Sequence, residues 1–181
     1  GRAVGLSGKD GGLIEAEKLQ IVTQDDSEAP PEIIDPGLVG NVTRIRPEII
    51  QTLSAQGFIP VVAPVGTGPE GETFNINADT AAGAVAAAVN AERLLMLTDV
   101  DAVYSDWATA AARAMRRASP GSLRELDFAP GSMAPKVEAA CEFVDQTGAM
   151  AAIGRLEDAQ AILRGEAGTL VTDAVAETEY A

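Results

Sequence analysis

One stretch of the chain, residues 81–101, constrains the fold more than any other. An Ala-rich segment with helical character over 81–91 is followed closely by the unbroken apolar run Leu94–Leu97, which ends at the polar turn Thr98–Asp101. Such a run is typical of a strand in the middle of a parallel sheet, because helices cover both faces of that strand. We therefore expect a parallel sheet with helices packed on it.

The same alternation of strand and helix continues on both sides of this stretch. Segments that predict further strands lie at 3–6, 13–18, 58–63, 148–153 and 169–171. Segments that predict further helices lie at 47–57, 135–146 and 156–163. Alternation of this kind predicts an α/β fold in which a mainly parallel sheet is sandwiched by helices.

More detailed expectations follow from turn residues and polarity. The strand at 13–18 is expected to return on the strand at 3–6 as a hairpin, and the strand at 58–63 is expected to be buried. Residues 23–36 contain three prolines and several acids, which predicts a surface loop. We expect a single domain over residues 1–181 with a frayed polar tail over 174–181.

Charge and composition exclude several classes of function. The chain has 27 Asp and Glu against 13 Lys and Arg, a net charge of −14. Nucleic acids and anionic membranes require a basic face, so neither is an expected partner. The chain has no His, which excludes Ser-His-Asp and Cys-His triads and His-ligated metals. Catalysis would depend on carboxylates, lysines, backbone amides or a hard cation.

The single cysteine, Cys141, cannot form an intrachain disulfide. It lies in a segment with helical periodicity, where a free cysteine is usually a small buried hydrophobe. No signal peptide is visible, and the longest apolar stretch, 81–89, is too short to span a bilayer. These features predict a cytoplasmic protein.

Two polar clusters stand beside predicted strands and helices. Asn75, Asn77 and Asp79 precede the Ala-rich helix. One such residue suffices to cap a helix, so the surplus indicates a site for an anionic ligand, with capping as the alternative. The segment 98–101 follows a parallel strand at its carboxyl end, where α/β sheets bind ligands, although turn formation alone would also explain it.

Lys136 stands in the first turn of a predicted helix. A lysine there opposes the helix dipole, and a local conflict of this kind tends to mark function, with a solvated surface lysine as the alternative. Gly8-Lys9 suggests a phosphate-binding P-loop. The motif requires Gly where Ala3 stands and Ser or Thr where Asp10 stands, so a glycine-rich turn is the preferred interpretation.

The sequence around these clusters resembles the acetylglutamate kinases. The resemblance is carried by 6–14, 37–42, 58–64, 74–83 and 94–100. Later segments resemble the carbamate kinases more closely, namely 101–104, 128–133, 136–140, 153–159 and 164–169. Both groups belong to the amino acid kinase fold family, and the resemblance covers nearly the whole chain. The first half receives more weight because it contains the segment that contacts the phosphate acceptor.

The resemblance implies roles for particular residues. Asn75, with Asn77, would bind the acceptor, Asp79 would organise the catalytic lysines, and Lys136 would contact the transferring phosphoryl group. The residues that would line the nucleotide are Thr98, Asp99, Val100, Asp101, Tyr104, Phe128, Ala129, Pro130, Met133 and Lys136.

The implied reaction is the ATP-dependent phosphorylation of the side-chain carboxylate of N-acetyl-L-glutamate, a step of arginine biosynthesis. Phosphoryl transfer relies on positioning and charge neutralisation, which suits a site without His. Mg²⁺ would be held mostly by the nucleotide and water, so no protein metal site is expected. Two alternatives remain: a carbamate kinase-like phosphotransferase and a non-catalytic nucleotide-binding protein.

The sequence departs from the family at its start. Family members begin with a strand bearing a further catalytic lysine and a Gly-Gly turn, followed by an acceptor-binding Arg, and none of these precedes Gly1. We expect the nucleotide-binding part of a kinase, with the N-terminal lobe largely absent and low activity of the chain alone. The expected partners are ATP and N-acetylglutamate or carbamate, and a homo-oligomer stays open.

Overall fold

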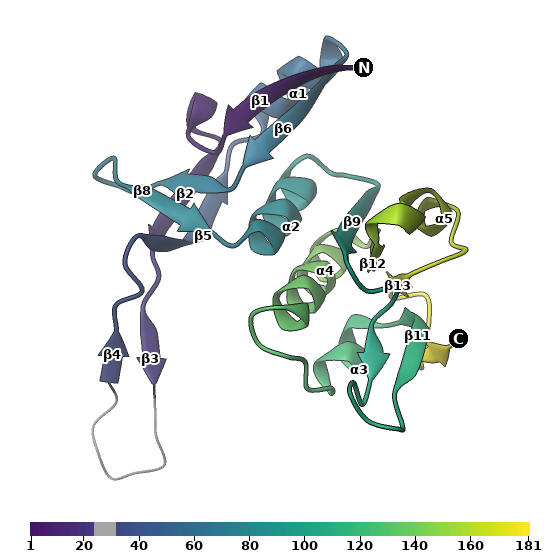
Figure 1. The fold of residues 1–181 in the computed structure, drawn as a ribbon. Helices are drawn as coiled ribbons and strands as arrows, with labels where there is room; N and C mark the ends of the chain where they lie inside the picture. The colour runs from purple at the N-terminus through teal and green to yellow at the C-terminus, as the bar shows by residue number, and fades with distance from the viewer. Residues whose placement is uncertain (24–31) are drawn as a thin grey trace. The chain divides into compact units, whose positions relative to one another are not determined.

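The structure is a computed structural model that describes residues 1–23 and 32–181 (Figure 1). It contains helices and several sheets, which confirms the predicted α/β class. Its internal contacts divide the chain into two compact units, Gly1–Ala81 and Ala82–Ala181. No helix of the described residues is long and apolar enough to cross a membrane.

The first unit contains a parallel pair of strands and a small barrel. Strand β1 (Arg2–Ser7) pairs in parallel with β6 (Phe58–Ala63), and α1 (Glu48–Ala55) packs against β6. The barrel consists of β2 (Ile14–Lys18), β5 (Val39–Ile45), β8 (Thr73–Ile76) and β7 (Val65–Thr67). A short 3₁₀ turn, η1 (Asp10–Gly12), lies between β1 and β2.

The start and end of α1 follow the sequence signals. Pro47 precedes the helix, and its fixed φ suits a helix start. Gly57 follows the helix with a φ of +75°, a left-handed conformation that glycine adopts at low cost and that ends the helix. The prediction of a helix over 47–57 is confirmed within two residues at either end.

Three expectations for this unit are wrong. Strand β2 does not form a hairpin with β1; it pairs antiparallel with β5, because β1 takes β6 as its neighbour. Residues 32–34 form β4 (Glu32–Ile34), which pairs with β3 (Ile21–Thr23), so this part of the expected loop is a strand. Residues 24–31 of that loop lie outside the described residues.

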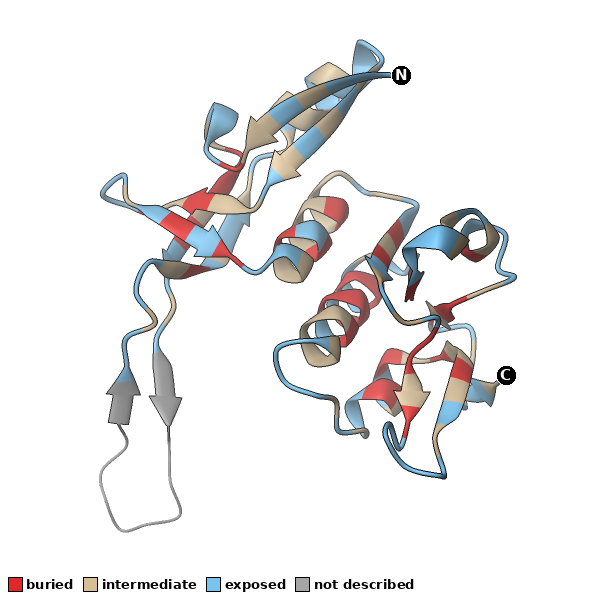
Figure 2. Ribbon diagram, in the orientation of Figure 1, coloured by how far each residue is buried: buried red, intermediate tan, exposed pale blue. Residues whose placement is uncertain are grey.

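The third correction concerns β6, which is not buried. Ile59 and Val61 are 56% and 57% exposed, and they alternate with less exposed neighbours along the strand (Figure 2). The alternation arises because one face of the β1–β6 pair lies against α1, while Ile59 and Val61 lie on the other face.

The second unit contains one sheet in the order β10-β11-β13-β12-β9, with β14 beside β11. The strands are β9 (Arg93–Thr98), β10 (Tyr104–Ser105), β11 (Arg113–Ala118), β12 (Met150–Arg155), β13 (Thr169–Val171) and β14 (Glu179–Tyr180). The helices are α2 (Ala78–Ala88), which begins in the first unit, α3 (Pro120–Arg124), α4 (Met133–Thr147), the 3₁₀ turn η2 (Leu156–Asp158) and α5 (Ala159–Leu163). The sheet is mixed: β9 and β12 run parallel, as predicted, whereas β12 and β13 are antiparallel. The expectation that the run 94–97 lies in the middle of the sheet is wrong, because β9 is the edge strand beside β12.

Helices cover both faces of this sheet. Leu94 and Met96 of β9 are buried in a core with the apolar face of α4, whereas Leu95, on the other face, lies with α5. Cys141 of α4 is fully buried in the core, and burial raises the pKa of its thiol to about 11. The thiol therefore stays protonated at neutral pH, as expected for a buried hydrophobe.

The C-terminal tail differs from its expectation. Residues 174–181 were expected to fray, yet Tyr180 pairs with Met115 of β11, and the N–H of Ala181 donates to the carbonyl of Ala114 at 2.9 Å. The guanidinium of Arg113 also lies 3.7 Å from the centroid of the Tyr180 ring. Pairing and the cation–π contact together hold the tail against the sheet.

Candidate functional site

The polar turn at the carboxyl end of β9 lies where the sequence predicts it. The Thr98 hydroxyl donates to the Asp99 carboxylate at 3.1 Å, and the Asp99 and Asp101 side chains are exposed while Val100 is half-buried. Two exposed acidic residues thus stand at the carboxyl end of β9, which lies at the edge of the sheet. Such an edge accepts hydrogen bonds from a polar ligand.

Tyr104 of β10 is joined to this turn. Its hydroxyl donates to the carboxylate of Asp101, at 3.1 and 3.3 Å from the two oxygens. Burial raises the pKa of Tyr104, and the hydrogen bond to Asp101 raises it further. The phenol therefore keeps its proton at neutral pH and acts as a donor that fixes the orientation of Asp101.

Close packing of glycine supports the backbone of the turn. A Cβ at Gly154 of β12 would lie 3.1 Å from the carbonyl oxygen of Asp101 and 3.0 Å from the Cα of Gly168. The turn therefore rests directly on β12, and a side chain at Gly154 would displace it.

Thr169 of β13 ties the strand that carries Tyr104 to the sheet. This buried hydroxyl accepts from the N–H of Val103 at 2.8 Å and donates to the carbonyl of Met115 at 2.7 Å. Both backbone groups are thereby satisfied in the interior, where an unpaired polar group is costly.

We expect Thr169→Val to destabilise the protein by about 2 kcal/mol, because it keeps the side-chain shape and removes both hydrogen bonds. Thr169→Ser keeps the hydroxyl and should cost less, about 1 kcal/mol, for the lost methyl group. Urea denaturation of the two variants checks the difference. Equal destabilisation by Val and Ser would assign the role of Thr169 to packing alone.

The second predicted nucleotide segment lies between α3 and α4. Phe128 and Met133 are half-buried and pack against the core, whereas Ala129 and Pro130 are exposed. The carbonyl of Ala129 accepts the N–H groups of two residues at the start of α4, at 3.5 and 3.3 Å. The segment is thus fixed at the beginning of that helix.

Lys136 is half-buried in the first turn of α4, as predicted. That turn contains no acidic residue, and the side chain of the N-cap residue, Ser132, makes no capping hydrogen bond. The positive end of the helix dipole and the Lys136 ammonium group therefore share one end of α4. Both favour a nearby anion.

In the first unit, Asn77 caps α2. Its side-chain oxygen accepts the N–H groups of Asp79 at 2.9 Å and Thr80 at 3.1 Å. Asn75 has no part in the cap: it lies exposed on β8, between Phe74 and Ile76, which are both buried. Capping thus accounts for one member of the cluster, and Asp79 stands half-buried in the first turn of the helix.

The Gly-Lys motif forms a turn that is hydrogen-bonded internally and to β8. The Lys9 ammonium group donates to the Thr73 hydroxyl at 2.6 Å. The Asp10 carboxylate accepts from the backbone N–H of Ser7 at 2.6 Å and from its hydroxyl at 3.0 Å, and these bonds lower the pKa of Asp10. The contacts favour the turn interpretation over a P-loop.

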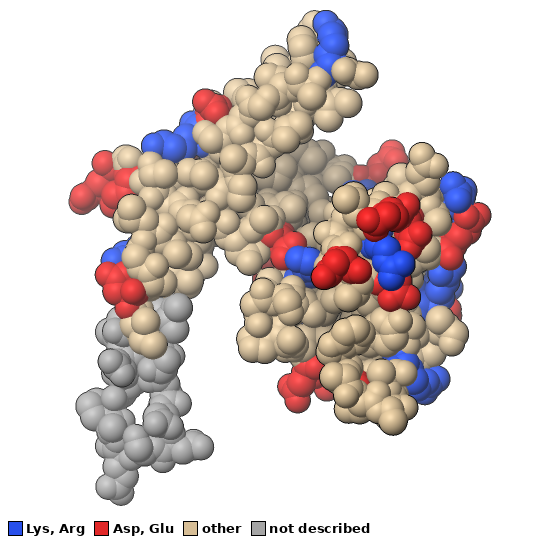
Figure 3. Space-filling view, viewed as in Figure 1, with Lys and Arg blue, Asp and Glu red and all other residues tan. Residues whose placement is uncertain are grey.

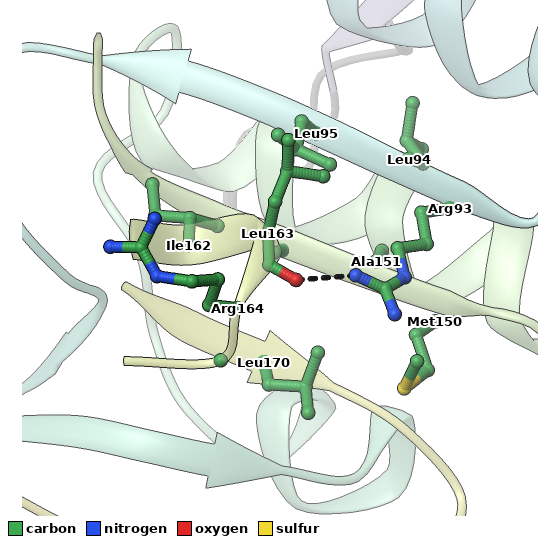
Figure 4. Close-up of a pocket in the computed structure, with 11 residues that line it drawn as sticks. Arg93, Leu94, Leu95, Met150, Ala151, Ile162, Leu163, Arg164 and Leu170 are labelled. Carbon is green, nitrogen blue, oxygen red and sulfur yellow. Dashed lines mark hydrogen bonds between the residues drawn. The ribbon is translucent and has the colours of Figure 1, made fainter. Parts of the chain in front are cut away.

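A cavity of about 200 Å³ lies elsewhere in the second unit, beside α5 (Figure 4). Arg93 donates to the carbonyl of Leu163 at 2.5 Å, and nearby Arg116 donates to that of Gly165 at 2.7 Å. Cationic groups that satisfy the last carbonyls of a helix stabilise its end. The lining contains none of the predicted site residues, so we assign these arginines a structural role.

The visible surface of the second unit carries acidic and basic side chains interspersed (Figure 3). The residues that the structure describes also contain no cluster of three or more His, Cys, Asp or Glu that could hold a metal ion.

Sequence reasoning missed one residue beside the site, the exposed Trp107, whose ring contacts that of Tyr104 at a centroid distance of 5.2 Å. Its only sequence signal was its rarity.

Comparison with known proteins shows the family of the chain. The sequence pattern of the amino acid kinase family matches residues 1–154, and the chain therefore belongs to that family. It is 53% identical over 146 residues to the acetylglutamate kinase of Solidesulfovibrio magneticus, a match that covers 80% of this chain and 48% of that protein. It is 49% identical over 156 residues to the acetylglutamate kinase of Gluconobacter oxydans, covering 83% and 50%.

Among solved structures, the carbamate kinase of Giardia lamblia bound to AMP-PNP matches with a TM-score of 0.68 at 25% identity, covering 84% of this chain and 52% of that one. These findings confirm the family resemblance and the fold predicted from the sequence. The chain spans about half the length of the curated relatives it matches.

Proposed function

We propose that the chain contributes the nucleotide-binding part of a kinase that transfers the γ-phosphate of ATP to the side-chain carboxylate of N-acetylglutamate. The 53% identity to an acetylglutamate kinase carries this proposal. A match that covers 80% of the chain necessarily includes both candidate clusters, Asn75–Asp79 and Thr98–Lys136. Its first expectation is that residues 1–181 bind Mg-ATP.

The roles of the residues follow from their charge. The attacking carboxylate and the γ-phosphate are both negative, so the reaction needs positive charge and fixed geometry. Asn75, exposed and neutral, would donate a hydrogen bond to the acceptor without adding negative charge. Lys136 would stabilise the charge on the transferring phosphoryl group, and Asp79 would hold cationic side chains in place.

The turn at 98–101 with Tyr104, together with Phe128, Ala129, Pro130 and Met133, would line the nucleotide. Mg²⁺ fits this proposal as an ion held by phosphate oxygens and water, because it retains much of its hydration. When bound, it would neutralise phosphate charge. The protein groups would position the nucleotide.

We expect Asp99→Ala to weaken Mg-ATP binding by about tenfold, because an exposed carboxylate at this edge accepts hydrogen bonds from the nucleotide. Asp173→Ala removes an exposed carboxylate outside the proposed site and should leave the dissociation constant unchanged. Isothermal titration calorimetry at low salt measures both. No heat and no thermal shift of the wild type at millimolar nucleotide would refute the proposal.

A carbamate kinase-like activity is the second candidate, because the carbamate kinase structure matches 84% of the chain. The acceptor separates the two. A coupled assay of ADP release with acetylglutamate and with carbamate, in a polypeptide that also contains the part of the kinase outside the matched half, decides between them. Release that depends on carbamate alone would favour the second candidate.

A further inference from the structure

Trp107 is the single tryptophan of the chain and lies between β10 and β11. Its side chain is 61% exposed. Burial of the large apolar surface of an indole ring stabilises a protein, and this chain has only 4% aromatic residues. An exposed tryptophan is therefore unexpected here unless it binds something.

The loop that carries Trp107 is held in a defined conformation. The N–H and the hydroxyl of Thr109 both donate to the carbonyl of Asp106, at 3.1 and 2.8 Å, and the N–H of Ala111 donates to the Thr109 hydroxyl at 3.1 Å. Trp107 therefore stands on a hydrogen-bonded turn that fixes where the indole points.

The residues on either side of Trp107 have left-handed backbone. Asp106 has a φ of +52° and Ala108 a φ of +66°. Alanine rarely adopts this conformation, which persists only where the surrounding structure imposes it. The strained backbone at Asp106 and Ala108 thus holds the Trp107 side chain in a position where little of it is buried. Strain of this kind is expected where an exposed side chain binds a ligand.

Trp107 is also coupled to the proposed nucleotide site. Its ring meets the Tyr104 ring in a T-shaped arrangement, with centroids 5.2 Å apart and planes inclined by 64°. The Tyr104 hydroxyl in turn donates to Asp101. A short chain of contacts thus links the exposed indole to the turn at the end of β9.

We propose that the purine base of ATP stacks on the indole of Trp107. This inference rests on the proposed function. Of the proposed substrates, only the nucleotide has a planar aromatic ring, and both acetylglutamate and carbamate lack one. Stacking engages the π-face, which every base has, so this contact should serve ATP and GTP alike.

The absence of other tryptophans makes the test direct, because all tryptophan fluorescence reports on this position. Mg-ATP, Mg-GTP and Mg-tripolyphosphate are titrated into the 181-residue chain and its Trp107→Ala and Trp107→Phe variants, with fluorescence for the wild type and calorimetry for all three. Tripolyphosphate carries the charge of the nucleotide without a base. Thermal melts establish that the variants are folded, as expected for changes at an exposed residue.

Both nucleotides should quench the fluorescence, and Trp107→Ala should weaken their binding by about 10- to 100-fold. Trp107→Phe keeps an aromatic face and should stay within about threefold of the wild type, and tripolyphosphate should bind all three proteins equally. ATP binding with unchanged fluorescence and unchanged affinity in Trp107→Ala would overturn this inference alone. A wild type that binds neither nucleotide would overturn the proposed function as well.

Discussion

Replacement of Lys136 by alanine is expected to lower the turnover of a kinase that contains this segment by about 10²- to 10³-fold, as for loss of one group that stabilises a transition state. Lys136 lies at the beginning of α4, where the helix dipole is positive, and the first turn of α4 contains no acidic residue. Charge develops on the phosphoryl group during transfer, so the ammonium group acts most strongly in the transition state. The KM for ATP should therefore change much less than kcat.

Lys9→Ala provides the matched control for this experiment. Lys9 of the glycine-rich turn donates to Thr73 of β8, and this structural role predicts near-normal turnover when the lysine is removed. Steady-state kinetics of both variants, with ADP release as the signal, separate the two lysines. Near-normal kcat in Lys136→Ala would return Lys136 to the role of a surface lysine, and a large loss in Lys9→Ala would revive the P-loop interpretation.

Local pattern predicted the elements of the second unit well. The apolar run 94–97 is β9 and pairs in parallel with β12, as predicted, because helices on both faces of the sheet favour apolar residues along the strand. The run did not reveal that β9 is an edge strand, since apolar residues report the covering of the faces and not the number of neighbouring strands. Strand partners were harder to predict. The pairing of β2 with β5 and of Tyr180 with Met115 joins segments far apart in the chain, and no local pattern specifies such a choice.

In the candidate site, too, local sequence pattern predicted some residues, whereas others depend on contacts between segments far apart in the chain. Asn77 was singled out as part of a surplus of polar groups, and the structure gives it the capping role that the sequence had left open. Thr169 and Gly154 support the site through a buried hydroxyl and a close backbone approach, which become visible only when β12 and β13 lie beside the turn. Trp107 depends on the left-handed residues around it, which sequence pattern does not reveal.

Gly8→Ala is expected to destabilise the first unit by at least about 3 kcal/mol, near the upper range for overpacking. A Cβ there would overlap the carbonyl oxygen of Val65 and lie 2.7 Å from side-chain atoms of Ile14. The N–H of Gly8 donates to the Ala63 carbonyl at 3.1 Å, and its own carbonyl accepts from the N–H of Ile14 at 2.6 Å. The backbone at Gly8 therefore cannot move aside without breaking bonds to both neighbouring segments.

Gly5→Ala is the matched control, because Gly5 lies in the same strand region and a Cβ there meets nothing within 4 Å. Its expected effect is neutral to about 0.5 kcal/mol stabilising, since alanine restricts the unfolded chain. Amide hydrogen exchange across β1, β2 and β6 measures the free energy of opening in each variant. Gly8→Ala should accelerate exchange there by more than about a hundredfold, equivalent to the loss above. Exchange as slow as in Gly5→Ala would mean that the turn between β1 and β2 can shift to accommodate a Cβ atom. Close packing would then not be the reason for glycine at position 8.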